Sequence, residues 1–419
     1  MVPVARAVID GPWSPLRIAV YRSIWLAALV SSVGSFMHLA AAGWAMTLLT
    51  ASPTLIGLVQ TSWALPGFLL ALHSGAFADL IDRRRLILVT EFGALVLAAA
   101  MAVLQWTSSL SAPLLLVGTL LISMVMTVSA PAFMALTPHL VGPQKASQAL
   151  GLDAIARNVA TALGPAVAGV VMVLEGPGSV FMLNALSFAG VIVVVQRRRT
   201  GWGEGQREEH VNAAIARGVR EIARSQTLRR PLVRVGLSML AAASVAALLP
   251  AIAADSLDLG SRGYGVLAAC QGLGSVLAVA VMPRLRAPSR PERAVAAAGA
   301  AWTLGALLVA VSGTTAVAAV GIVMCGAGWM GVINTLYSNY MVELPEWMKG
   351  RGAAMVMLTV WLGTSAGSAL WGAVASIADL RTALFAAAAL NAAIVVMSPL
   401  LMRVHPPALI APLPADASG

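Results

Sequence analysis

Long apolar runs separated by short polar connections occupy most of the chain. A membrane-spanning helix needs about 20 consecutive, mostly apolar residues, and twelve runs meet this requirement. They cover residues 22–48, 54–78, 86–106, 112–137, 147–174, 178–196, 231–254, 263–283, 293–312, 314–340, 352–377 and 380–402. The pattern predicts an all-α membrane protein with twelve transmembrane helices.

One long polar stretch, 197–230, divides these runs into two sets of six. The predicted organisation is a tail (1–21), a six-helix bundle (22–196), a linker (197–230), a second six-helix bundle (231–402) and a second tail (403–419). Apolar residues at helical spacing between Glu208 and Ser225 predict an amphipathic linker helix on the membrane surface. The last segment, rich in Pro and Ala, is expected to be disordered.

The placement of charge predicts the topology. Only 11% of residues are charged, and 27 basic against 17 acidic residues give a net charge of +10. At or beside the connections on one side, the only basic residues are Arg262 and Arg381, whereas the connections and tails of the other side are rich in Lys and Arg. The positive-inside rule then predicts a multi-pass protein of the plasma (inner) membrane with both ends in the cytoplasm. Contact with anionic lipid accounts for the positive charge, so nucleic acid is not an expected partner.

The two halves resemble each other weakly. Adding 203 to a first-half number places Gly164 on Gly367 and Gly169 on Gly372, and both pairs lie in Gly/Ala-rich helices. Two six-span halves joined by a linker on one side suggest transport, with a site near the bilayer midplane between the halves.

The connection between the second and third runs carries the most informative motif, a Gly, three intervening residues, an Asp, and then an Arg run. It resembles the inner-loop motif of the major facilitator superfamily, although Leu80 and Asp82 depart from the usual pattern. The resemblance implies two bundles related by a pseudo-two-fold axis, and a charge latch that stabilises one transporter state. An Arg run that only fixes topology is a compatible alternative. The matching residues are Gly75, Asp79, Arg83 and Arg84.

Two further segments resemble the exporter branch of that superfamily, the transmembrane secretion effectors, which includes siderophore exporters of the enterobactin type and drug exporters. One is the Gly-Pro motif of the fifth span, and the other is a loop of Pro, acidic, basic and Gly-Arg before the eleventh. The resemblance covers about residues 20–402 and implies export of a small molecule, protons as coupling ion and a monomer. The residues are Gly164, Pro165 and Gly169 in the first motif, and Glu346, Lys349 and Arg351 in the second.

Ionisable residues inside spans are costly and mark functional candidates. His38 and Glu91 are candidates for proton coupling, with packing as the alternative for His38. Asp153 and Arg157 are four residues apart, share one helix face and can pair. Arg157 either lines the central cavity or its inner gate, or belongs to a structural pair near the interface and extends its charge toward water.

Polar and aromatic side chains within the spans are candidate cavity residues, although hydrogen bonding between helices explains each one singly. Together they suggest a largely apolar cavity suited to a hydrophobic or zwitterionic substrate. They are Gln60, Trp63, Gln271, Asn334, Asn339 and Trp361.

No Walker-type phosphate loop and no cluster with metal-ligand spacing occurs, so an enzyme, a cofactor and a metal are not expected. The leading prediction is a secondary active exporter of small organic molecules. An importer of a small metabolite and a transport-inactive membrane sensor with the same fold are the alternatives.

Overall fold

The computed structural model describes residues 11, 13–80, 82–197, 225–285 and 291–401, and within these ranges every regular element is a helix. The first half contains η1 (Ser14–Arg17), α1 (Ala19–Leu49), α2 (Pro53–Leu80), α3 (Arg83–Trp106), α4 (Ala112–Val141), η2 (Pro143–Lys145) and α5 (Ala146–Arg197). The second half contains α7 (Gln226–Ala251), η3 (Ile252–Ser256), α8 (Ser261–Leu285), α9 (Pro291–Val311), α10 (Thr315–Glu343), α11 (Glu346–Ile377) and α12 (Leu380–Leu401).

The element α5 supplies two of the twelve spans. Gly176 has φ 76°, a conformation that glycine adopts without a Cβ penalty, and Pro177 starts the next helical segment. Residues 146–175 and 177–197 therefore form the fifth and sixth spans. Within the described residues, eleven helices are long and apolar enough to cross a membrane, and one of them is this double element. The twelve-helix prediction is confirmed.

Helix ends differ from the predicted boundaries by up to about six residues, because helices extend past the hydrocarbon into the polar interface. Residues 19–21, predicted as tail, begin α1, and residues 226–230, predicted as linker, begin α7. The predicted loop with Glu346, Lys349 and Arg351 is instead the start of α11, directly after Pro345. The predicted linker helix falls mainly on residues 198–224, outside the described residues.

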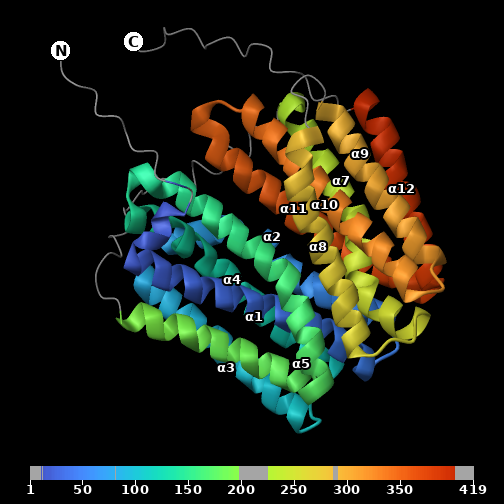
Figure 1. Ribbon diagram of the computed structural model, residues 1–419, viewed down its shortest axis with the longest axis horizontal. Helices are drawn as coiled ribbons and strands as arrows, with labels where there is room; N and C mark the ends of the chain where they lie inside the picture. Colours follow the sequence, from blue (N-terminus) through green and yellow to red (C-terminus); the bar gives the residue numbers. More distant parts are fainter. Residues whose placement is uncertain (1–10, 12, 81, 198–224, 286–290, 402–419) are drawn as a thin grey trace.

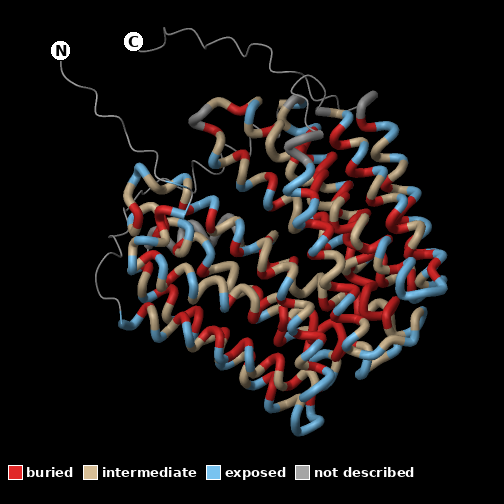
Figure 2. Tube along the Cα trace, in the orientation of Figure 1, coloured by how far each residue is buried: buried red, intermediate tan, exposed pale blue. Residues whose placement is uncertain are grey.

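Arg84 and Arg197 mark one end of the molecule, here called the basic side, and Thr54 and Ser376 mark the opposite end, the far side. Helices α1 to α5 form one bundle, α7 to α12 form the other, and the pairs α2–α11 and α5–α8 make most of the contact between them. Figure 1 shows the bundles meeting at the far side and their helices diverging toward the basic side. Buried residues lie between helices and exposed ones along the outer faces (Figure 2), where large apolar side chains such as Val30 and Leu174 would contact lipid.

The glycines related by the weak repeat occupy equivalent places in the two bundles. A Cβ on Gly164 would meet Phe36 of α1, and one on Gly367 would meet Leu240 of α7. Gly169 instead packs against α8, and Gly372 packs against Thr54 of α2. Each bundle thus uses one glycine for its internal contact and the other for contact with its partner, as a pseudo-two-fold arrangement requires.

A buried ion pair links two helices of the second bundle. Arg234 of α7 donates from Nη1 to Oε1 of Glu292 at the start of α9, at 2.8 Å. The arginine side chain is only 2% exposed and the glutamate 25%. No local pattern in the sequence predicts this pair, because the two residues are 58 positions apart.

Candidate functional site

A cavity of about 150 Å³ lies between the two bundles. The first bundle contributes residues such as Phe36 and Pro165, and the second contributes residues such as Pro250, Tyr264 and Trp329. Most of the lining is apolar, as is typical of small-molecule sites. A site shared by the bundles changes shape when they move relative to each other, which is what alternating access requires.

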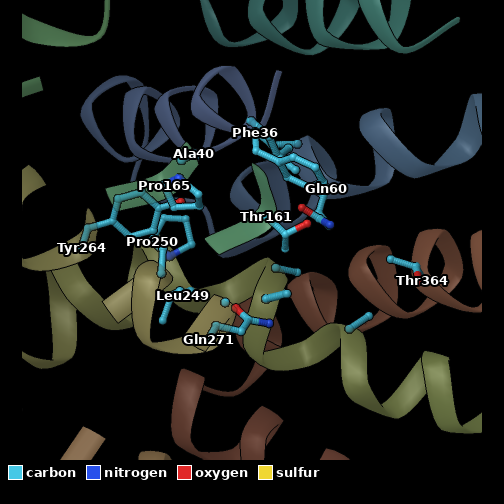
Figure 3. A pocket seen from close by; sticks show the side chains of 18 of the residues that line it. Phe36, Ala40, Gln60, Thr161, Pro165, Leu249, Pro250, Tyr264, Gln271 and Thr364 are labelled. Atoms are coloured by element: carbon cyan, nitrogen blue, oxygen red, sulfur yellow. The ribbon is translucent and has the colours of Figure 1, made fainter. Parts of the chain in front are cut away.

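Neutral polar side chains supply the hydrogen-bonding groups of the cavity. Gln60 of α2, Thr161 of α5 and Gln271 of α8 line it, and Figure 3 shows them around the space between the bundles. Each glutamine amide offers two donors and a carbonyl acceptor. Gln60 and Gln271 were candidates from the sequence, whereas Thr161 and Tyr264 were missed, because neither carries a charge or belongs to a motif.

The far side of the cavity is closed by close packing of α2 on α11. Thr54 donates from Oγ1 to Oγ of Ser376 at 2.8 Å, and Thr61 donates to the carbonyl of Ser365 at 3.2 Å. A Cβ on Gly57 would lie 2.7 Å from the carbonyl oxygen of Ser368. Only a residue without a side chain permits this approach.

The fifth-span motif contributes the second closing contact. A Cβ on Gly169 would lie 2.6 Å from the Cα atom of Gly265 in α8. Pro165 lines the cavity one turn away, and Gly164 packs on α1. The three motif residues therefore face three different surroundings: the opposite bundle, the cavity and the neighbouring helix.

The inner-loop motif lies at the basic side, at the junction of α2 and α3. Asp82 accepts a hydrogen bond from the backbone N–H of Arg85 at 2.7 Å, so one of the two residues that depart from the family pattern caps α3. Arg84 donates to the carbonyls of Val195 and Gln196 at the end of α5. Arg83 is buried, and its Nε and Nη1 atoms have no partner among the described residues. Gly75 and Asp79 belong to α2, but the surroundings of both residues lie outside the described part.

Replacing Arg84 by alanine is expected to lower the free energy of unfolding by about 1–2 kcal/mol, because two carbonyls at a helix C-terminus lose a charged donor. Thermal unfolding in detergent measures the change. Arg85→Ala is the matched control, since Arg85 is exposed and such surface changes stay within about 0.5 kcal/mol. Equal shifts in the two variants would contradict a special role for Arg84.

His38 and Glu91 are buried inside the first bundle and do not line the cavity. His38 is fully buried, its ring centroid lies 4.7 Å from that of Phe181, and neither ring nitrogen has a partner among the described residues. Glu91 of α3 is 6% exposed, and its Oε2 atom also lacks a described partner. Buried polar atoms without partners are uncommon and need an explanation.

Asp153 and Arg157 do not form the expected ion pair. The Asp153 carboxylate instead accepts hydrogen bonds from the Tyr21 hydroxyl at 3.1 Å and the Thr137 hydroxyl at 3.0 Å. It faces α1 and α4, and the charge of Arg157 acts on it only from a longer distance. Arg157 is exposed and begins the turn that leads to Thr161, whose hydroxyl donates to the Arg157 carbonyl at 2.9 Å.

The remaining candidates are spread over several places. The Trp63 carbonyl accepts a hydrogen bond from Ser123 of α4 at 2.5 Å. Trp361 of α11 packs where a Cβ on Gly67 would lie 2.7 Å from its ring, so it belongs to the contact between bundles. Asn334 and Asn339 are half-buried on α10 and are not among the residues that line the cavity.

Lys349 and Arg351 lie near the start of α11 and are half-buried, and the side chain of Glu346 lies outside the described part. These residues therefore lie at the basic side. The part of α11 that packs on α2 comes later in the helix, from Trp361 onward.

Two bundles of six membrane helices around a shared cavity define a membrane transporter. The family described as transmembrane secretion effector matches residues 10–410. The chain belongs to this family of the major facilitator superfamily, as the motifs had indicated. Family and fold are those of membrane transporters, which are generally not enzymes.

Relatives and solved structures agree with this assignment. The chain is 23% identical over 254 residues to an uncharacterised MFS-type transporter of Sinorhizobium fredii, and the match spans 60% of this chain and 62% of that protein. It is 25% identical over 134 residues to the staphyloferrin A transporter of Staphylococcus aureus, across 32% of this chain and 34% of that one. The chain thus matches less than two thirds of the length of either relative.

Among solved structures, the nucleoside transporter NupG gives a TM-score of 0.74 at 11% identity, covering 92% of this chain and 99% of that one. A bacterial homologue of the human lysosomal transporter Spinster, in an inward-facing and occupied conformation, gives 0.74 at 12% identity, covering 93% and 98%. At such identities the similarity establishes the fold alone.

Proposed function

We propose that this protein is a secondary active exporter of small organic molecules, working by proton-coupled alternating access in the plasma membrane. The observation that carries the proposal is the cavity lined by both bundles and closed at the far side by glycine contacts. With the basic side in the cytoplasm, as the charge distribution predicts, this conformation faces inward and is ready to take up a substrate from the cell.

Two features favour export of an organic molecule. The fifth-span motif resembles that of antiporters in the superfamily, and Gly169 lies at the contact between the bundles, where it can influence the change between states. One similar protein is a transporter of the siderophore staphyloferrin A. Asp79 and Arg83 remain the proposed latch at the basic side.

Flux in vesicles of both orientations tests the proposal. Cells that lack their own efflux pumps are challenged with dyes, antibiotics and siderophores, with and without the protein. A compound that accumulates less is then followed in right-side-out and everted vesicles. We expect uptake into everted vesicles only, abolished when the proton gradient is dissipated. Uptake into right-side-out vesicles would favour an importer, and no flux of any compound would favour a sensor.

Glu91 is the proposed proton-carrying group, and His38 is the second candidate. A carboxyl group buried inside one bundle can exchange a proton only if the conformational change brings it to water, which would link protonation to transport. Glu91→Gln is expected to remove the response of transport to an imposed pH step while leaving exchange of substrate across the membrane.

His38→Ala provides the comparison, measured in the same proteoliposomes. Loss of the pH response in His38→Ala alone would assign coupling to the histidine. An unchanged pH response in both variants would exclude both residues as the proton-carrying group.

A further inference from the structure

The described residues that line the cavity include no charged side chain. The polar side-chain atoms of the lining come from amide, hydroxyl and indole groups: Gln60, Thr161, Tyr264, Gln271, Ser275, Thr364 and Trp329. Such groups donate and accept hydrogen bonds without selecting either sign of charge. Any preference for a charged substrate must therefore come from a residue at the edge of the cavity.

Arg157 lies at that edge. It is exposed and sits four residues before Thr161 on a continuous helix, so it is about one turn, or about 6 Å, nearer the basic side. At about 100° per residue, Arg157 is rotated only about 40° from Thr161. Arg157 therefore shares with Thr161, which lines the cavity, one face of α5, and lies on that face nearer the basic side.

Within the described residues the guanidinium of Arg157 forms no close ion pair, and its charge acts on the Asp153 carboxylate only from a longer distance. The nearest acidic residue on its own helix, Asp153, is held by Tyr21 and Thr137. The arginine lies 11 residues into α5, about 16 Å from its start, where an unpaired charge is costly. A guanidinium presents several N–H donors in a planar arrangement that matches carboxylate and phosphate groups.

Within the proposed transport function, we infer that the substrate is an organic anion whose charged group binds Arg157 and whose neutral body binds between Gln60 and Gln271. The anionic group lies toward the basic side, and the body extends past Thr161 to the aromatic surface of Phe36 and Tyr264. This assignment narrows the substrate predicted from the sequence, which was hydrophobic or zwitterionic.

Three probes with one body and different charge test the inference: a methoxycoumarin carboxylate, its uncharged carboxamide, and an analogue with a trimethylammonium group. Binding to the protein in nanodiscs is followed by fluorescence anisotropy. We expect the carboxylate to bind about tenfold or more tightly than the other two, since charge-assisted hydrogen bonds are the stronger kind. Arg157→Gln should abolish this preference, and Arg157→Lys should retain part of it.

Arg262→Gln is the matched control, because Arg262 is an exposed arginine of α8 at the far side, and it should leave the preference unchanged. Equal binding of the three probes, no binding of any, or a preference that survives Arg157→Gln would overturn the inference. Counterflow of the same probes in proteoliposomes separates it from the proposed function. Counterflow without charge preference would support the proposed transport function and contradict the anion site at Arg157. Binding that depends on Arg157, without counterflow, would support the anion site and contradict transport.

Discussion

Valine at Gly57 or Gly169 is expected to reduce transport about tenfold or more and to hold the bundles apart at the far side. A Cβ at Gly57 would lie 2.7 Å from a backbone oxygen of α11, and one at Gly169 would lie 2.6 Å from a backbone atom of α8. Backbone atoms cannot rotate away as a flexible side chain can. Overpacking of this kind costs about 1–3 kcal/mol, and 1.4 kcal/mol is a tenfold change in a population.

A larger population of molecules open at the far side would make the cavity more accessible from that side. Cys270 and Cys325 are the two cysteines of the chain, and replacing both by serine allows a single reporter, Gln60→Cys, inside the cavity. A membrane-impermeant maleimide applied from the far side should label this cysteine faster in Gly57→Val and Gly169→Val than in the parent.

Gly190→Val is the matched control for these variants. Gly190 is exposed on the second half of α5, and an added Cβ there would meet nothing within 4 Å. It should leave both transport and labelling unchanged. If Gly57→Val and Gly169→Val behaved like this control, the glycine contacts would not control closure of the far side.

Arg234→Ala is expected to lower the free energy of unfolding by about 3–5 kcal/mol, the loss typical of breaking a buried ion pair. The Arg234 side chain is 2% exposed and bonds to Glu292 at 2.8 Å, so its removal leaves a cavity and breaks this bond to the Glu292 carboxylate. Thermal unfolding in detergent, and the yield of monodisperse protein, measure the effect.

A double substitution separates the ion pair from simple packing. Arg234→Met combined with Glu292→Leu should unfold closer to the parent than either single variant, because a buried pair can often be replaced by apolar residues of similar volume at little loss. Arg293→Ala, at an exposed neighbouring arginine, should change stability by no more than about 0.5 kcal/mol. A double variant as unstable as the sum of the singles would show that the two residues act independently.

Several parts of the site could be read from the sequence because they belong to local patterns. The Gly-Pro motif marked Gly169 and Pro165 as candidate functional residues. The structure places Gly169 at the contact between the bundles and Pro165 at the cavity. Gln60 and Gln271 stood out as amides in apolar runs, and both line the cavity. Their roles in binding remain predictions.

Other parts depended on contacts that no local pattern records. Asp153 and Arg157 have the spacing of an ion pair within one helix. The Asp153 carboxylate nevertheless accepts its hydrogen bonds from Tyr21 and Thr137, which belong to other helices. The partner of Arg234 is likewise far away in the chain. Hydrogen bonds and ion pairs between helices follow from how helices are placed, which spacing along one helix cannot specify.

The sequence by itself determined the number of helices, their order and their predicted orientation, because leaving water requires long apolar runs and basic residues stay on one side of the bilayer. Only the tertiary structure decided which face of each helix meets lipid, a neighbour or the cavity. In a bilayer the lipid-facing and the buried positions are both apolar, so hydrophobic periodicity carries little information about helix rotation. The rotation of α5, which turns Gly169 to α8 and Gly164 to α1, is fixed by close packing between helices.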